Sequence, residues 1–374
     1  MKLIILADDV GNKLWPVTSN SYPKALLPVY SSRSLLYETL ARSSLIAASG
    51  NHKDIFIVLP TESLPSLMDS GLFIPYWIPP YNIIGVPSSL GSAVSISIAC
   101  QYILRNNLAS KDEQVAFMTA DQFFWPASTY VFHYYNIIAH AKSDPKVLYM
   151  LGLEPAGATE THNYISCNWE EAKTVGLTST SSDGTTKVTT SIVPVTECEV
   201  KPTLISSANL INRNALWDLS SYIWNIGDTI DHVDEALTDR HRTAINDLFH
   251  TSKNGTVYLD GSAIRQTWNS LDSISFSDDV VPTVINSGKV KVGVVSYVIW
   301  ATFDNWISIK HLLYDSNLYQ AQQLPNVHQV DSQRNLIFKP PDKEVAIFGI
   351  SDLIIIDTGD KLLIGTPGGI HEHF

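Results

Sequence analysis

Cysteine is scarce in this sequence, and the few cysteines lie far apart. Cys100, Cys167 and Cys198 are the three among 374 residues, and none belongs to a CxxC or Cys/His spacing. A disulfide framework needs several cysteines that can pair, and a zinc site needs closely spaced ligands, so this composition disfavours both. A reducing compartment, the cytoplasm, is the location we expect.

Long apolar runs and basic clusters are also missing. No stretch reaches the roughly 18 apolar residues of a membrane span, and Met1-Lys2 leads directly into an apolar segment rather than a signal peptide. We therefore expect no membrane partner. The formal net charge is −12, and Lys and Arg do not cluster. Because nucleic-acid binding depends on clustered positive charge, we expect no nucleic-acid partner either.

The composition that is present is that of a globular protein, with 45% hydrophobic and 17% charged residues. Short continuous apolar runs predict strands buried on both faces, and segments with apolar residues three and four apart predict helices. The alternation of the two predicts an α/β fold, with a Rossmann-like, mainly parallel sheet flanked by helices. The predicted strands are 2–7, 54–60, 82–86 and 115–120, and the predicted helices include 34–48, 91–105 and 223–248.

The pattern of apolar and turn residues changes near residue 326. Short β runs separated by turn residues follow, at 336–338, 345–348, 353–356 and 362–364. This spacing predicts a small C-terminal β-domain, for which β-helix-like coils are one form. We therefore divide the chain into an α/β domain, residues 1–325, and a β-domain, residues 326–374.

Two motifs near the start carry the most information about function. Residues 6–16 read LADDVGNKLWP, and residues 23–28 read PKALLP. They resemble the Gly-rich motif Leu-Ala-Gly-Gly-x-Gly-Thr-Arg-Leu-Trp-Pro and the Pro-Lys-x-x-Leu-Pro element of sugar-1-phosphate nucleotidyltransferases, and are most similar to the mannose-1-phosphate guanylyltransferases. The resemblance implies a nucleotidyltransferase type A-like fold. It also implies a reaction in which a sugar phosphate attacks the α-phosphorus of a nucleoside triphosphate.

The resemblance implies a set of site residues for that reaction. Phosphoryl chemistry of this kind needs backbone N–H groups and basic residues on the phosphates and carboxylates on Mg²⁺. By position, the catalytic candidates are Lys13, Lys24 and Lys201, the nucleotide-binding candidates are Ala7, Asp8, Asp9, Gly11, Pro87 and Gly91, and the metal candidate is Asp121. An active enzyme would use Mg²⁺ as its cofactor, and an inactive one would need none.

The same positions also depart from the family. Asp8 and Asp9 stand where the family has glycines, so they add bulk and negative charge where phosphate would approach. Two interpretations of these aspartates remain open: they end a strand and cap the following turn, or they help bind Mg²⁺. A second metal-binding aspartate of the family is matched by Thr302, with Asp304 two residues further on.

Other ligand-contacting positions differ in the same way. Leu90 and Gly91 stand for an arginine and an asparagine that contact the base, and Thr161 and Asn163 stand for two glycines of the sugar loop. We matched residues 204–211 to the family's Trp-Asn-Ser-Gly segment, and residues 273–276 to its Ser-Ile-Asp-Tyr segment. In the second match, Ser275 takes the place of the acid.

Two functions follow as alternatives. The first is a degenerate guanylyltransferase-like protein, a pseudoenzyme with weak or no transfer and a regulatory, scaffolding or nucleotide-sugar-binding role, with GTP among its candidate ligands. The second is an active sugar-1-phosphate nucleotidyltransferase that makes a GDP-mannose-like product. For the first, we expect a nucleotide or nucleotide sugar as ligand, and either a homo-oligomer or a complex with an active paralogue.

Overall fold

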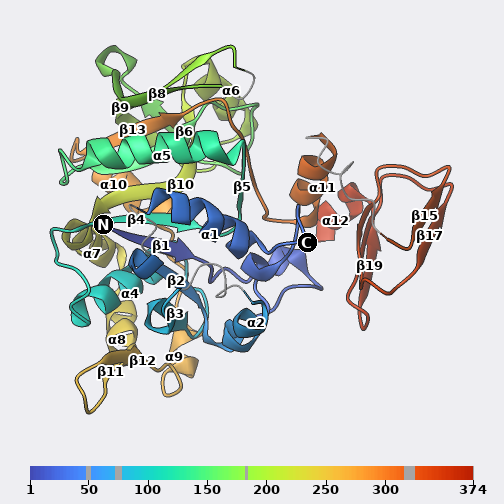
Figure 1. The fold of residues 1–374 in the computed structure, drawn as a ribbon, viewed down its shortest axis with the longest axis horizontal. Coiled ribbons are helices and arrows are strands. Elements are labelled where there is room, and N and C mark those ends of the chain that lie inside the picture. The colour runs from blue at the N-terminus through green and yellow to red at the C-terminus, as the bar shows by residue number, and fades with distance from the viewer. Residues whose placement is uncertain (48–51, 72–77, 182–183, 316–324, 374) are drawn as a thin grey trace.

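A mixed sheet of ten strands forms the centre of the protein in a computed structural model, which describes residues 1–47, 52–71, 78–181, 184–315 and 325–373 (Figure 1). The strands follow the order β3, β2, β1, β4, β10, β6, β13, β9 and β7, and β8 pairs with β9. Their bounds are β1 Lys2–Leu6, β2 Ile55–Pro60, β3 Ile83–Val86, β4 Gln114–Thr119, β6 Leu148–Leu153, β7 Tyr164–Cys167, β8 Lys173–Thr180, β9 Lys187–Glu199, β10 Leu216–Asn225 and β13 Val290–Val295.

The direction of the strands changes across the sheet. The neighbours β3, β2, β1 and β4 are parallel, and so are β6 and β13. β10 runs antiparallel to both β4 and β6, and β9 runs antiparallel to β13 and β7. The predicted α/β class is confirmed, and the parallel arrangement holds mainly for the part of the sheet built by the N-terminal strands.

The strands of the parallel part are buried on both faces because their side chains alternate between two hydrophobic cores. In β1, Ile4 and Leu6 pack into one core, and Leu3 and Ile5 into the other. This is why the run is continuously apolar instead of alternating with polar residues. Such a strand needs helices on both sides.

Helices cover both faces of the sheet (Figure 1). Residues of α4 Ser92–Arg105, α7 Ile226–Ala236 and α8 Asp239–Leu248 belong to one core, and those of α1 Leu35–Ile46 and α5 Ala127–Ala141 to the other. The remaining helices are α2 Leu64–Asp69, α6 Leu204–Asn212, α9 Arg265–Trp268, α10 Val281–Ile285, α11 Trp306–Asp315 and α12 Pro367–His373. Among the residues described, no helix combines the length and the apolar character that a membrane crossing requires.

The segment predicted as helical at 223–248 has a more complex structure. Its first residues, up to Asn225, complete strand β10, and the rest forms α7 and α8 with a break between them. The side chain of Asn225 accepts a hydrogen bond from the Asp228 N–H, and that of Thr238 accepts one from the His241 N–H. Both are N-cap bonds, and they fix where the two helices begin.

The C-terminal residues form two small sheets. β15 Val327–Val330 pairs in parallel with β17 Val345–Phe348, and β16 Leu336–Phe338 pairs in parallel with β18 Ile354–Asp357, whose other edge carries β19 Leu362–Gly365. Figure 1 shows them beside α11 and α12, at one end of the molecule. The predicted boundary at 325/326 adjoins residues outside the described ranges, so the division into domains stays a prediction.

The C-terminal sheet shares a core with the segments that frame the strand ends. Leu336, Ile354 and Leu363 pack in one cluster with Leu14, from the N-terminal loop, and Phe303. The Trp306 indole N–H, at the start of α11, donates to the Trp15 carbonyl at 2.9 Å. The C-terminal strands therefore support the loops that enter the site described next.

Candidate functional site

Two adjoining cavities open at the carboxyl ends of the parallel strands β1 and β4, where ligands bind in open α/β sheets. The first, the loop cavity, has a volume of about 780 Å³, and its walls include Asp8, Ser89 and Gly91. The second, the tryptophan cavity, has a volume of about 1280 Å³, and its walls include Trp217 and Trp300. Both are lined by Asp9, Asn12, Lys24, Thr119, Asp121, Lys201, Ser275 and Asp278.

Most of the predicted site residues meet at these cavities. Ala7, Asp8 and Gly91 line the loop cavity, Gly11 and Lys13 line the tryptophan cavity, and Asp9, Lys24, Asp121 and Lys201 line both. Pro87 does not appear among the residues lining either cavity in the described part of the chain. Its ring instead lies against Gly261, so closely that a Cβ on Gly261 would come within 2.4 Å of it.

Lys24 is the centre of the site. It is 4% exposed, and its Nζ lies 2.5 Å from Asp121 Oδ2, 2.6 Å from Asp9 Oδ2 and 3.7 Å from Asp304 Oδ1. Burial alone would lower the pKa of Lys24, but Asp121, Asp9 and Asp304 together raise it above its usual value. Burial alone would also raise the pKa of Asp121, yet the Lys24 ammonium holds it below its usual value. This lysine is therefore an ammonium at neutral pH.

Asp9 closes the N-terminal loop over Lys24. Its Oδ1 accepts a hydrogen bond from the Gly11 N–H at 2.9 Å, while its Oδ2 contacts the Lys24 ammonium. Gly11 has a φ of +74°, and a Cβ there would lie 2.9 Å from the Lys24 Cβ, so the turn needs a glycine. Asp9 thus caps the turn after β1, as the first of the two interpretations of the aspartates expects.

Asp8 is held by the neighbouring helix α4. It is buried, and its Oδ2 accepts a hydrogen bond from the Ser95 hydroxyl of α4 at 2.7 Å. Burial raises the pKa of Asp8, and hydrogen bonds from Ser89 and Ser95 oppose that rise. Asp8 and Asp9 therefore have different surroundings although they are adjacent in sequence.

Asp304 reaches the site although Thr302 stands where an aspartate was expected. Thr302 is the last residue of β14, Ile299–Thr302, which pairs with β5, Gln122–Trp125, immediately after Asp121. The Thr302 hydroxyl donates to Asp304 Oδ2 at 2.5 Å, and the other oxygen of Asp304 faces Lys24. The carboxylate two residues further along thus joins Asp9 and Asp121 around one ammonium.

Lys201 is also held by a carboxylate of the protein. Its Nζ lies 2.5 Å from Asp278 Oδ2, and its backbone N–H donates to Asn163 Oδ1 at 3.1 Å. Asn163 in turn donates to Asp278 Oδ1 at 2.8 Å. Burial alone would raise the pKa of Asp278, but Lys201 and Asn163 outweigh it and lower that pKa. Asn163, expected in place of a sugar-loop glycine, therefore fills space and links Lys201 to Asp278.

Two acids near Lys201, Asp218 and Asp278, were not predicted from the sequence. Residues 204–211, which we had matched to the Trp-Asn-Ser-Gly segment, form helix α6, and Ile205 is 79% exposed there, so that match was wrong. The pair Trp217-Asp218 in β10 lies at the cavity instead. A Trp followed by an acidic residue near the start of a mostly apolar strand was a signal that the sequence offered.

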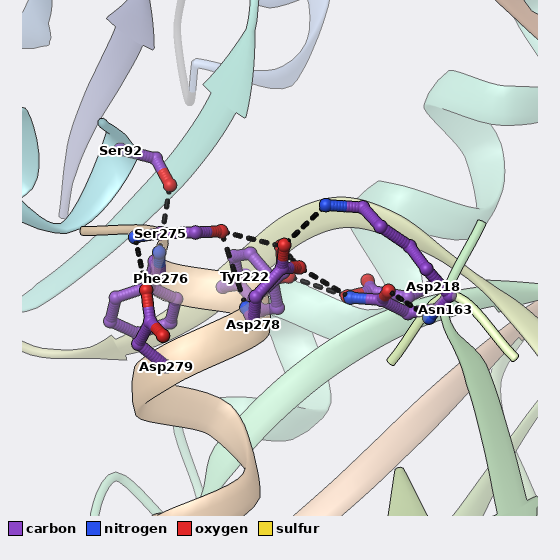
Figure 2. A network of polar contacts seen from close by, with 10 residues as sticks. Ser92, Asn163, Asp218, Tyr222, Ser275, Phe276, Asp278 and Asp279 are labelled. Carbon is purple, nitrogen blue, oxygen red and sulfur yellow. Dashed lines mark hydrogen bonds and ion pairs between the residues drawn. The ribbon is translucent and has the colours of Figure 1, made fainter. Parts of the chain in front are cut away.

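Asp278 lies in the first turn of a short helix, and Ser275 is the N-cap residue of that helix. The Ser275 hydroxyl accepts from the Asp278 N–H at 3.2 Å, and Asp279 Oδ2 accepts from the Ser275 N–H at 2.7 Å (Figure 2). This reciprocal cap resembles a capping box, whose Ser-x-x-acid pattern can be found in a sequence. It places two carboxylates where the family's single acid was thought to be lost.

Gly91 is required by its surroundings as well as by its position. Its φ is +89°, and a Cβ there would lie 2.3 Å from the Ile274 carbonyl oxygen. We expect Gly91→Ala to lower the free energy of unfolding by roughly 2–4 kcal/mol, through strain and displacement of the 274 backbone. Denaturant unfolding measures this change.

Gly255→Ala is the matched control for Gly91→Ala. Gly255 has a similar φ of +84°, but among the described residues no atom other than those of its chain neighbours lies within 4 Å of the position that its Cβ would take. The difference between the two variants isolates the contact with Ile274. Equal losses in both variants would show that backbone conformation alone accounts for the effect.

The fold and these cavities define a class of protein. A mixed α/β sheet whose parallel strands end at a cavity with lysines and carboxylates is the arrangement of a protein that binds a small ligand at the strand ends. No known protein-family profile matches the chain. Comparison with individual proteins is more informative.

The chain is similar over nearly its whole length to curated proteins. It is 21% identical over 381 residues to the xanthan biosynthesis protein XanB of Xanthomonas campestris pv. campestris, covering 99% of this chain and 71% of that protein. It is 24% identical over 382 residues to a mannose-1-phosphate guanylyltransferase of Escherichia coli, covering 99% of this chain and 73% of that protein.

Solved structures show the same fold. A Thermus thermophilus structure described as a mannose-1-phosphate geranyltransferase has a TM-score of 0.66 at 16% identity, with 99% of this chain and 96% of that one covered. A putative glucose-1-phosphate thymidylyltransferase of Bacillus anthracis has a TM-score of 0.52 at 12% identity, with 83% and 93% covered. Together these likenesses support the sugar-1-phosphate nucleotidyltransferase family for this chain.

Proposed function

We propose that this chain is a degenerate relative of the mannose-1-phosphate guanylyltransferases, with weak or no nucleotidyl transfer and a regulatory, scaffolding or nucleotide-sugar-binding role. The observation that carries the proposal is the position of Asp9. Its two oxygens take the Gly11 N–H and the Lys24 ammonium. A backbone N–H and a basic side chain are the groups that a nucleotide-binding loop offers to phosphate. Here the protein's own carboxylate takes both.

A triphosphate would have to displace this carboxylate and remain beside it. Two unit charges at about 4 Å repel by about 4 kcal/mol at an effective dielectric constant near 20. Eight acidic side chains and three lysines line the two cavities in the described part of the chain. Two of these lysines, Lys24 and Lys201, already pair with carboxylates. The charge balance therefore opposes a polyanion in the position that transfer requires.

The shape of the cavities supports a binding role. The tryptophan cavity has Trp217, Trp300 and His162 in one wall, with the rings of His162 and Trp300 4.7 Å apart between centroids. Binding sites for small ligands are clefts of roughly 300–1,000 Å³ with aromatic walls and a few polar groups, and the cavities here are of that order. A nucleotide or nucleotide sugar is the ligand class that we assign to them.

One observation favours the active alternative, a sugar-1-phosphate nucleotidyltransferase. Asp304 lies beside Asp121 at the Lys24 ammonium, so two carboxylates converge even though Thr302 replaces the expected acid. An enzyme with this pair would need Lys24 to release both carboxylates during the reaction. The two functions make opposite predictions in one assay.

We expect purified protein to release no sustained pyrophosphate from any nucleoside triphosphate with any of several hexose 1-phosphates and Mg²⁺. The reason is that Asp9 occupies the phosphate-binding groups of the loop. The matched control is Asp121→Ala, assayed in parallel to identify release by a contaminant. Sustained release by the wild type that Asp121→Ala abolishes would contradict the proposal and establish the active alternative.

Calorimetric titration of the protein with nucleotides distinguishes the nucleotide-sugar-binding role from the regulatory and scaffolding roles. Binding of GTP or GDP-mannose without turnover supports the nucleotide-sugar-binding role. Absence of binding by every nucleotide tested leaves the regulatory or scaffolding role, exercised by a homo-oligomer or by a complex with an active paralogue.

A further inference from the structure

Three carboxylates from separate parts of the chain surround one ammonium. Asp9 follows β1, Asp121 follows β4 and Asp304 follows β14, and all three face Lys24 Nζ, at 2.6, 2.5 and 3.7 Å. Three carboxylates that converge on one point are ordinarily neutralised by a bound cation. In this protein the cation is a side chain.

The residues present do not fit the Mg²⁺ ion that the family likeness implies. Mg²⁺ requires oxygen ligands at about 2.0–2.1 Å in octahedral geometry. Here the Lys24 ammonium bridges the candidate ligands Asp121 and Asp9, and Thr302 replaces the further aspartate. With the Lys24 ammonium in place, no group of three or more His, Cys, Asp and Glu side chains among the described residues is arranged to hold a metal ion.

We propose that the Lys24 ammonium permanently takes the place of the divalent cation in this site, so that the protein holds its ligand without a metal ion. The proposal rests on the proposed function for the class of ligand. The position of the cation itself is a property of Asp9, Asp121, Asp304 and Lys24, and it can be measured with no ligand present.

Asp9 is the residue that makes the replacement stable. The family has glycine at this position, so the likeness implies one carboxylate fewer around the lysine. In this chain Asp9 adds a third carboxylate, and its bond to the Gly11 N–H fixes the direction of its other oxygen toward Lys24. A metal ion entering this group would lie beside a buried ammonium, and the two positive charges would repel each other.

The test is a titration of metal-free protein with Mn²⁺, followed by calorimetry and electron paramagnetic resonance. For the wild type we expect no saturable Mn²⁺ site that depends on Asp121. For Lys24→Met, which removes the charge but keeps the length of the side chain, we expect one new site that binds Mn²⁺ at least about tenfold more tightly than any in the wild type, because three carboxylates then lack a cation. Adding Asp121→Asn to Lys24→Met should abolish the new site.

Two results would overturn the inference. One is a saturable Mn²⁺ site in the wild type that Asp121→Asn removes. The other is a folded Lys24→Met variant, as judged by circular dichroism, that gains no site. If Lys24→Met does not fold, the wild-type titration decides alone. Pyrophosphate release that needs no metal would contradict the proposed function and leave this inference standing, so the two fail separately.

Discussion

Lys24→Met is expected to lower the free energy of unfolding at neutral pH by about 3–5 kcal/mol, because removal of one partner of a buried ion pair leaves an uncompensated charge. Lys24 is 4% exposed, and its partner Asp121 has a side chain that is 15% exposed. Among the described residues, no other cation lies within ion-pair distance of Asp121 to replace the ammonium. Denaturant unfolding in a metal-free buffer measures the loss.

Lys310→Met is the matched control for this prediction. Lys310 is also 4% exposed, but its partner Asp352 has a side chain that is 55% exposed and that also pairs with Arg334. The carboxylate left behind is then solvated and paired, so we expect a loss of only about 1 kcal/mol. Adding Asp121→Asn to Lys24→Met should recover part of the larger loss. Equal losses at positions 24 and 310 would show that the ion pairs of Lys24 contribute nothing specific.

The sequence was sufficient to predict the N-terminal half of the sheet. Four continuous apolar runs correspond to β1, β2, β3 and β4, because strands buried on both faces need apolar residues at every position. Asp9 follows β1 and Asp121 follows β4, and the carboxyl ends of these neighbouring parallel strands lie together although the two residues are far apart in the sequence. Both lie at Lys24.

The rest of the sheet could not be predicted from the sequence, and neither could the positions of Asp218 and Asp278 at the cavity. β10 is antiparallel to both β4 and β6, and its register against β6 shifts between Asp218 and Tyr222. Asp218 lines the tryptophan cavity at that irregularity, which no apolar periodicity encodes. Lys201, which contacts Asp278, likewise has a φ of +42°, a backbone conformation that the sequence does not indicate.

Asp218 is a buried acid that the fold retains at a cost in stability. Its Oδ2 accepts from the Tyr222 hydroxyl at 2.6 Å (Figure 2), and its Oδ1 accepts from the Ser220 N–H at 2.9 Å. Burial raises the pKa of Asp218 from 3.8 to about 7, against the effect of those two hydrogen bonds. The folded protein therefore holds a proton here that the unfolded chain releases in mild acid.

The sign of the pH dependence follows from that difference. A carboxyl group whose pKa is raised by folding contributes its full stability below the unfolded value of 3.8, and that contribution is lost as the pH rises through about 7. One pKa unit corresponds to about 1.4 kcal/mol, so ionisation of Asp218 costs the folded state up to about 4 kcal/mol at pH 8. An amide of the same shape avoids this cost, because it carries no charge.

We expect Asp218→Asn to raise the free energy of unfolding at pH 8 by about 2–4 kcal/mol and to leave it nearly unchanged at pH 4. Urea unfolding at a series of pH values checks this. Asp357→Asn is the contrasting control, since the buried Asp357 pairs with Lys343 at 2.5 Å and folding lowers its pKa. That variant should lose stability at neutral pH.

A stability difference between Asp218→Asn and the wild type that does not vary between pH 4 and pH 8 would mean that Asp218 does not titrate in this range. A gain in the free energy of unfolding of Asp218→Asn that is confined to high pH would instead show that Asp218 destabilises the wild-type protein. An acid that lines a cavity and costs stability is what we expect of a group retained for binding.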